Sequence, residues 1–245
     1  MMKKIFLTCL LLIYTASAGA YNNQDIAAVQ SGFDCINGDL SGADLSGMNL
    51  AGRNFTGTDF SEARLVKTNL ENCRLTDADF SHAFLQQSNL RNTQAEKADF
   101  SYVSAPEADF TNANLAGANL YRSQMNGCRF LNADLRGIHA EESSWDKIRA
   151  DYADFSYANM PYCWFYQAQL RNTLFEGANL YKAKMQQADL TDAQLRSAKM
   201  GRAFLYQANL TNTNFNAAVL EYADLRNAKM NYTEFGTAFK DNAKF

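Results

Sequence analysis

The two histidines, His82 and His139, are the first candidates for catalysis because imidazole titrates near neutral pH and binds metals. They are 57 residues apart, and no cysteine or histidine spacing typical of a metal site surrounds either. No glycine-rich phosphate loop and no serine–histidine–aspartate set can be placed in the chain. The sequence therefore predicts no catalytic, cofactor-binding or metal-binding residue, and no enzyme activity.

The sequence that carries these polar residues repeats with a period of five. From Leu40 to Phe235, every fifth residue forms a slot of 40 positions, and Leu, Phe, Met or Trp fills 36 of them. Two residues earlier, a second slot holds Ala, Ser, Thr or Cys at 34 of 39 positions. Neither a helix, with period 3.6, nor a strand, with period 2, explains this spacing.

The exceptions in the two slots are coupled. Alanine replaces the large residue at positions 95, 105, 140 and 150, and three of these follow a branched residue in the small slot: Val103, Ile138 and Ile148. Such compensation is expected where both slots share one close-packed interior. Met48 and Arg53 enlarge the small slot without compensation, so we expect looser packing at the start of the array.

A second period of twenty residues is superimposed on the five-residue period. Between residues 72 and 212, asparagine two residues after the large slot recurs at spacings that are multiples of twenty, and glutamine recurs likewise at Gln167, Gln187 and Gln207. Four five-residue units therefore make one turn, and amides one turn apart should form hydrogen-bonded ladders. The asparagines are Asn72, Asn92, Asn112, Asn132, Asn172 and Asn212.

The runs ADLSGMNLAG, ANLAGANLY and ADLTDAQLRSAKM resemble pentapeptide-repeat proteins, whose motif is A-(D/N)-L-x-x. The resemblance covers about residues 38–239. It implies an all-β fold, a right-handed quadrilateral β-helix in which one pentapeptide forms each side and every fifth residue points inward. At twenty residues per turn we expect about ten coils.

Residues 1–20 have the features of a bacterial secretory signal peptide. A basic MMKK precedes the apolar IFLTCLLLIY, and ASAGA offers small residues for cleavage. A buried core helix is the alternative. We expect a periplasmic or secreted protein, and no integral membrane segment after cleavage. Losing Lys3 and Lys4 changes the net charge from −3 to −5, which disfavours nonspecific binding to nucleic acid.

Residues 21–37 break the five-residue register and should cover the first coil as a short helix. Asn23 could be its N-cap, Ile26 and Val29 share a face, and Gly32 would end it. Residues 38–239 then form the β-helix and 240–245 a C-terminal tail. Cysteines in the small slot (Cys73, Cys128 and Cys163) are expected to be buried and reduced.

Aspartate is common in outward positions, where the simplest interpretation is a solvated carboxylate. Outward aromatic residues are more informative, because ten of them share four positions of the twenty-residue turn and should lie along one edge or two adjoining sides. We call this set the aromatic stripe. Its members are Phe84, Tyr102, Tyr121, Tyr162, Trp164, Tyr166, Tyr181, Phe204, Tyr206 and Tyr222.

The stripe permits two interpretations. Its rings could stack between coils and stiffen the rod, or they could form a contact surface for a protein, a glycan or a second copy in a homodimer. The first functional hypothesis is therefore an exported, non-enzymatic scaffold that binds a partner along the stripe. A glycan-binding module is an alternative, because sugar rings stack on Trp and Tyr.

A DNA-mimicking inhibitor of gyrase is a further alternative, implied by the family resemblance. The chain departs from that pattern because it is predicted to be exported and is only mildly acidic. It also carries outward cations, among them Lys182, Lys184, Lys199 and Arg202. Nucleic acid is accordingly not an expected partner.

Overall fold

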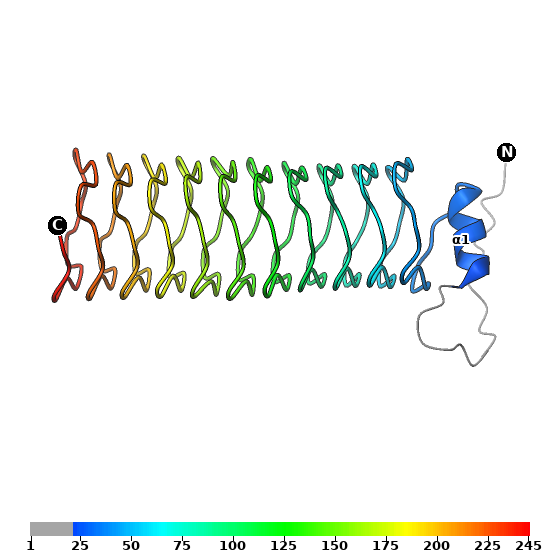
Figure 1. The fold of residues 1–245 in the computed structure, drawn as a ribbon, viewed down its shortest axis with the longest axis horizontal. Helices are drawn as coiled ribbons and strands as arrows, with labels where there is room; N and C mark the ends of the chain where they lie inside the picture. The colour runs from blue at the N-terminus through cyan, green and yellow to red at the C-terminus, as the bar shows by residue number, and fades with distance from the viewer. Residues whose placement is uncertain (1–21) are drawn as a thin grey trace, which may run out of the picture.

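The computed structural model describes residues 22–245, so the predicted signal peptide lies outside the described residues. One short helix, α1 (Asn23–Gln30), is followed by a regular stack of coils. Figure 1 shows α1 at one end of this rod and the C-terminus at the other. The coils are joined by isolated parallel β-bridges, and no longer strand forms in the described residues.

Each bridge joins residues twenty apart, from Asp39↔Asp59 to Asp224↔Lys244. The amide of Leu40 donates to the carbonyl of Asp59 at 2.8 Å, and the amide of Asp59 donates to Gly38 at 2.9 Å. The twenty-residue turn read from the asparagines is thus the repeat of the backbone itself. Residues 240–245, predicted as a tail, continue this winding, because Lys244 still bridges to the preceding coil.

A β-turn forms each corner. The amide of Ala43 donates to the carbonyl of Leu40 at 3.1 Å, and the second central residue of such turns has positive φ, as in Asn92 (φ 55°) and Gly117 (φ 69°). Glycine and asparagine tolerate this conformation best, which explains the asparagine column. Asn112 Nδ2 donates to Asn92 Oδ1 at 3.0 Å, which confirms the predicted amide ladder at this step.

The outward aspartates have a structural role that the sequence interpretation missed. The side chain accepts a hydrogen bond from the amide two residues on, in the manner of an Asx-turn, and so fixes the entry to the corner. All nine aspartates in this outward slot between positions 44 and 224 do so: Asp44, Asp59, Asp79, Asp99, Asp109, Asp134, Asp154, Asp189 and Asp224.

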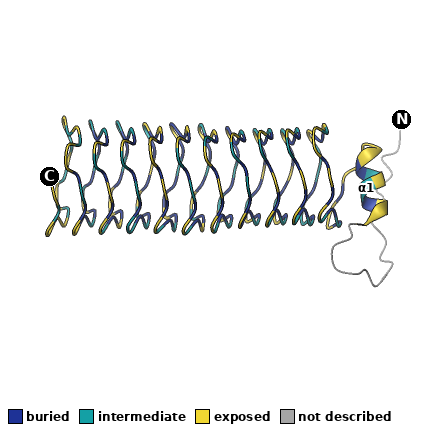
Figure 2. Ribbon diagram, in the orientation of Figure 1, coloured by how far each residue is buried: buried dark blue, intermediate teal, exposed yellow. Residues whose placement is uncertain are grey.

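The large slot points inward as predicted. Phe80, Leu120 and Phe155 have no exposed surface, and Figure 2 shows buried and exposed residues interleaved along the coils. Phenylalanine rings stack between adjoining coils, with centroids 4.9 Å apart for Phe80 and Phe100. The core is therefore one continuous column, in which each coil packs mainly on its neighbours.

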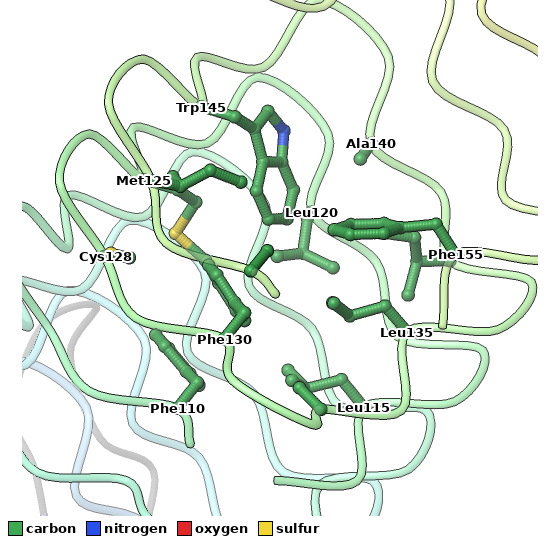
Figure 3. Packing of buried hydrophobic residues seen from close by; sticks show 14 of the residues in the cluster. Phe110, Leu115, Leu120, Met125, Cys128, Phe130, Leu135, Ala140, Trp145 and Phe155 are labelled. Carbon is green, nitrogen blue, oxygen red and sulfur yellow. The ribbon is translucent and has the colours of Figure 1, made fainter. Parts of the chain in front are cut away.

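Trp145 gives a second reason for two of the alanines in the large slot. Its indole is fully buried, and Figure 3 shows it filling the interior while Ala140 presents only a methyl group. Ala140 and Ala150 are the large-slot neighbours on either side of Trp145 in the same coil. The indole nitrogen donates to Ser143 Oγ at 2.5 Å. Volume is conserved around the indole as well as within each pair of slots.

The small-slot cysteines are buried and free, as predicted. Each thiol donates to the carbonyl 23 residues earlier: Cys73 to Leu50 at 3.1 Å and Cys163 to Ala140 at 2.7 Å. Burial raises the pKa of Cys73 to about 11 and of Cys163 to about 12. These thiols are therefore small core groups that remain protonated near neutral pH.

Helix α1 covers the first coil. Its N-cap is Asn22, one residue earlier than predicted, and the side chain of Asn22 accepts from the amide of Gln24 at 2.9 Å. Val29 is buried and Ile26 packs against the core. The helix ends at Gln30, with Gly32 following at φ 94°. Within residues 22–245, no helix has the length and apolar character needed to cross a bilayer.

Candidate functional site

One side of the rod carries the centre of the aromatic stripe. Its outward row runs through successive bridges from Phe84 to Ser104, Gln124, Ser144 and Trp164. The row continues from Trp164 to Lys184 and from Lys184 to Phe204. Because neighbouring members are one coil apart, they are spaced about 4.8 Å along the rod. Between Phe84 and Trp164 the row is thus polar, so its aromatic members fall at the two ends of this stretch.

The stripe therefore divides into two groups. In the first, Phe84 is followed by Tyr102 and Tyr121, whose rings meet edge to face with centroids 5.5 Å apart, and His82 stacks on Tyr102 at 4.7 Å. The second group holds the other members of the stripe: Tyr162, Trp164, Tyr166, Tyr181, Phe204, Tyr206 and Tyr222. Tyr152, Tyr157 and Tyr232 are exposed at other positions of the turn.

Cations interleave with the second group. Lys184 Nζ lies 3.9 Å from the ring centroid of Trp164, and Lys182 Nζ lies 5.2 Å from that of Tyr162 and 5.3 Å from that of Tyr181. The guanidinium of Arg202 lies 5.2 Å from the ring of Tyr222. We call this surface the panel: Tyr162, Trp164, Tyr181, Lys182, Lys184, Arg202, Phe204 and Tyr222.

The sequence analysis named Lys182, Lys184 and Arg202 as outward cations but did not place them beside the aromatic rings, although a signal for this placement exists. Lys182 and Lys184 each lie twenty residues after an aromatic member of the stripe, and Arg202 lies twenty before Tyr222. The same spacing that located the rings places these cations one coil away from them. Arg122 on Tyr121 (5.1 Å) and Arg64 on Phe84 (6.0 Å) repeat the arrangement in the first group.

An open groove begins where the polar part of the row meets the panel. It has a volume of about 700 Å³, and Gln124, Ser144 and Trp164 of the row line it together with Tyr162 and Lys182. The small side chain of Ser144 precedes the indole in the row, while Lys184 follows it. A second groove of about 470 Å³ lies on the other flank of Trp164, beside Tyr166 and Tyr206.

The panel cations lack acidic partners. Within the described part of the chain, no carboxylate lies within 4.0 Å of Lys182, Lys184 or Arg202. By contrast, Glu142 at the edge of the groove pairs with Arg122 at 2.8 Å, and its hydrogen bond raises the pKa of that guanidinium. Glu142, which lines the groove, is thus already paired with a cation.

A ladder of amides borders the panel. Gln167 Nε2 donates to Gln187 Oε1 and Gln187 Nε2 donates to Gln207 Oε1, both at 2.9 Å, as the glutamine spacing predicted. Gln167 also donates to the hydroxyl of Tyr166 at 3.2 Å. These bonds hold the edge of the surface in one arrangement.

The two histidines are far apart on the rod. His82 stacks on Tyr102, while His139 bridges to Asn119 and Asn159. Among residues 22–245, no group of three metal-binding side chains comes together.

A family model described as pentapeptide repeats matches the chain in eight copies, over residues 39–77, 73–106, 96–131, 106–139, 153–192, 188–227 and 208–236. No curated protein sequence matches the chain.

Among solved structures, the chain is similar to HetL, a pentapeptide repeat protein involved in heterocyst differentiation regulation from the cyanobacterium Nostoc sp. strain PCC 7120. The two are 23% identical over 90% of this chain and 94% of HetL, with a TM-score of 0.52. This likeness supports the fold.

Two further structures are less similar. A pentapeptide repeat protein from the cyanobacterium Cyanothece 51142 is 21% identical over 50% of this chain and 90% of its own, with a TM-score of 0.41. QnrB1, a plasmid-mediated fluoroquinolone resistance protein, is 18% identical over 82% of this chain and 88% of its own, with a TM-score of 0.47.

Proposed function

The chain belongs to the pentapeptide-repeat family, and from that premise we propose that it is a non-enzymatic scaffold whose panel binds a protein partner. The observation that carries the proposal is the gathering of half-exposed rings on one side of a rigid rod. Trp164 is 49% exposed and Tyr222 is 54% exposed. Tyrosine, tryptophan and arginine dominate binding hot spots in protein interfaces, and clustered exposed apolar surface is typical of partner sites.

The contacts between rings argue against the alternative that the stripe only stiffens the stack. Among its described members, two pairs touch directly, Tyr102–Tyr121 and Tyr162–Tyr181. Trp164 and Phe204 are separated by Lys184 in the row. By comparison, stiffening is supplied inside the column, where phenylalanine rings stack coil upon coil. The outer rings therefore have surface available for a partner.

The alternatives of the sequence analysis are less well supported. A glycan ring would stack on an aromatic face, but Lys184 already occupies one face of Trp164. A mimic of duplex DNA needs a continuous acidic surface, whereas the panel presents three cations. Unchanged supercoiling by purified gyrase in the presence of this protein would remove the second alternative.

We further propose that the protein is exported and that its β-helix is right-handed with about ten coils. The apolar segment in residues 1–20 supports export to the periplasm or beyond, where the rod would meet envelope proteins. The family resemblance supports a right-handed β-helix, and bridges twenty residues apart between Asp39 and Lys244 support about ten coils. Fractionation of cells that express the full chain tests the first of these statements.

The partner proposal is tested by capture from envelope extract with the wild type and with Trp164→Ala/Tyr166→Ala. A protein recovered with the wild type and lost with this variant is the expected result. Tyr152→Ala/Tyr157→Ala is the matched control, because it removes two rings that are 64% and 69% exposed outside the stripe. Equal recovery with all three proteins would overturn the proposal.

A further inference from the structure

We infer that the partner docks through a short acidic peptide segment, with its carboxylates on Lys182, Lys184 and Arg202 and an apolar side chain in the groove beside Trp164. This inference rests on the proposed function and names the chemistry of the partner. Three observations carry it: the unpaired cations, the way they cover the aromatic faces, and the acidic residues that limit the cationic area.

The first observation is the lack of carboxylate partners for the panel cations. Lys182 and Arg202 hold the same position in adjoining coils, and Lys184 lies two residues from Lys182. The three charges therefore lie within about one coil spacing, about 4.8 Å, along the rod. No carboxylate within the described residues approaches them to 4.0 Å, in contrast to Arg122 and Arg171, which pair at 2.8 and 2.6 Å. Their charge is available to a ligand.

The second observation concerns the rings. An aromatic ring has a negative face and a positive edge. Lys184 lies over Trp164, Lys182 over Tyr162 and Arg202 over Tyr222, so cations meet the negative faces. On the side of each ring that carries a cation, a ligand meets the ammonium or guanidinium group together with the ring edge. Both attract carboxylate oxygens, which makes the panel complementary to an acidic segment.

The third observation limits the size of the ligand. Two acidic residues outside the ion pairs lie at the two ends of the panel: Asp146 one coil before it, and Glu221 next to Tyr222. Glu142 and Asp224 pair with Arg122 and Arg226 instead. The whole chain also has a formal charge of −3. A long polyanion such as nucleic acid would meet Asp146 and Glu221 and be repelled. Two or three carboxylates on a short peptide match the cationic area.

The groove supplies a place for an apolar side chain next to the carboxylates. Trp164, Tyr162 and Phe204 line it on the panel side, and Ser144 and Gln124 line the other side. Ser144 Oγ donates to Asn126 Oδ1 at 2.7 Å, so its hydroxyl is satisfied without a ligand. An aromatic or branched side chain of the partner can therefore bury its surface against Trp164 without leaving that hydroxyl unpaired.

The test uses a fluorescein-labelled peptide of sequence GDEFEDG and its neutral counterpart GNQFQNG, measured by fluorescence anisotropy against the full chain. The acidic peptide is expected to bind at least about fivefold more tightly, since each exposed charge pair adds a modest increment. Raising the salt concentration should shrink the difference, because screening shortens the range of the attraction. Lys182→Gln/Lys184→Gln/Arg202→Gln should abolish the difference.

The matched control is Lys97→Gln/Arg149→Gln/Arg196→Gln, which removes the same charge from three exposed or half-exposed cations away from the panel and should keep the preference. Equal binding of the two peptides, or no binding of GDEFEDG up to about 1 mM, overturns the inference. The inference is also overturned if Lys182→Gln/Lys184→Gln/Arg202→Gln still binds GDEFEDG more tightly than GNQFQNG. Competition experiments compare unlabelled GDEFEDG with a galacturonate oligosaccharide and an oligodeoxynucleotide. If one of these polyanions displaces the labelled peptide at a lower concentration than unlabelled GDEFEDG does, the panel is a site for that polyanion instead.

The two proposals fail separately. If Trp164→Ala/Tyr166→Ala loses a captured envelope protein while GDEFEDG shows no preference, the scaffold function stands and the acidic segment is wrong. If capture is unaffected by that variant, the proposed function fails whichever way the peptide experiment turns out.

Discussion

Arg53 Nη1 donates a hydrogen bond of 2.6 Å to the backbone carbonyl of Val29, near the end of α1. Arg53 occupies a small slot, where the repeat otherwise favours alanine. Its guanidinium leaves the column at the first coil and reaches the helix that covers it. One of the two residues that break the pattern without compensation therefore helps to tie the cap to the rod.

Arg53→Met should loosen α1. Methionine should fit the small slot at position 53, because Met48 already occupies the preceding small slot, so the substitution mainly removes the hydrogen bond to Val29. We expect a loss of about 1–2 kcal/mol in the opening free energy of residues 23–37, because a hydrogen bond from a charged donor is removed. Native-state hydrogen exchange measures this locally. Arg74→Met, in an outward slot, should leave exchange at α1 unchanged, and equal effects of the two substitutions would contradict the role of Arg53.

Trp145 and Ala140 should be energetically coupled, because the indole takes the volume that a leucine would fill at position 140. Ala140→Leu alone should cost about 1–3 kcal/mol by overpacking, and Trp145→Leu alone should cost about 2–4 kcal/mol by leaving a cavity. The double variant should be more stable than the sum of the two predicts, by about 1 kcal/mol or more. Urea unfolding of the four proteins measures the coupling, and additive losses would show that the alanine is unrelated to Trp145.

The buried thiols should make the rod less stable at alkaline pH. Burial raises the pKa of Cys73 to about 11 and of Cys163 to about 12, and it also raises the pKa of Cys128. The unfolded thiols ionise near pH 8.5. The folded state then holds protons that the unfolded state has lost, so stability falls as pH rises from about 8.5 toward 11. The slope that each thiol contributes is about half of 1.4 kcal/mol per pH unit at pH 8.5 and approaches about 1.4 kcal/mol per pH unit above pH 9.5.

The measurement compares urea unfolding at pH 7.5 and pH 9.5 for the wild type and for Cys73→Ala/Cys128→Ala/Cys163→Ala. Alanine is the commonest residue in this slot, so the variant should fold. It should lose most of the alkaline destabilisation, while tyrosine ionisation contributes equally to both proteins. The same pH dependence in the variant would show that these thiols do not control it.

The spacing of the sequence was sufficient to predict the column, since the five-residue slots correctly assign Phe80 and Leu120 to the interior. The five-residue spacing did not predict the last part of the β-helix, where the backbone continues to wind without an inward apolar residue. Lys240 stands in the large slot and the pattern fades there, yet Phe239 still bridges to Val219. Winding is held by hydrogen bonds between coils as well as by side chains. Asn22 and Asn23 are equally good caps, so the residue pattern could not choose between them.

The surface was predicted less completely than the core. Counting by twenty placed Phe84, Trp164 and Phe204 in one row, as the bridges show. It did not reveal that Ser104, Gln124 and Ser144 interrupt that row, because only aromatic residues were followed. Periodicity reports which side of a coil a residue occupies, whereas the pairing of Lys184 with Trp164 depends on the conformation of a long side chain.

Collisional quenching of tryptophan fluorescence should report the electrostatic potential of the panel without any partner. The chain has two tryptophans: Trp145 has no exposed surface and Trp164 is 49% exposed. Quenching should therefore come from Trp164, beside Lys182 and Lys184. At low ionic strength, the ratio of the iodide to the caesium quenching constant should exceed the ratio measured for a free uncharged tryptophan derivative, because the cations concentrate the anion near the indole. Lys182→Gln/Lys184→Gln/Arg202→Gln should lower this ratio toward that of the free derivative, while neutral acrylamide should respond little to the substitutions. A wild-type ratio at or below that of the free derivative would mean that the negative charge of the whole chain outweighs the panel, and the electrostatic basis for an acidic partner would be lost.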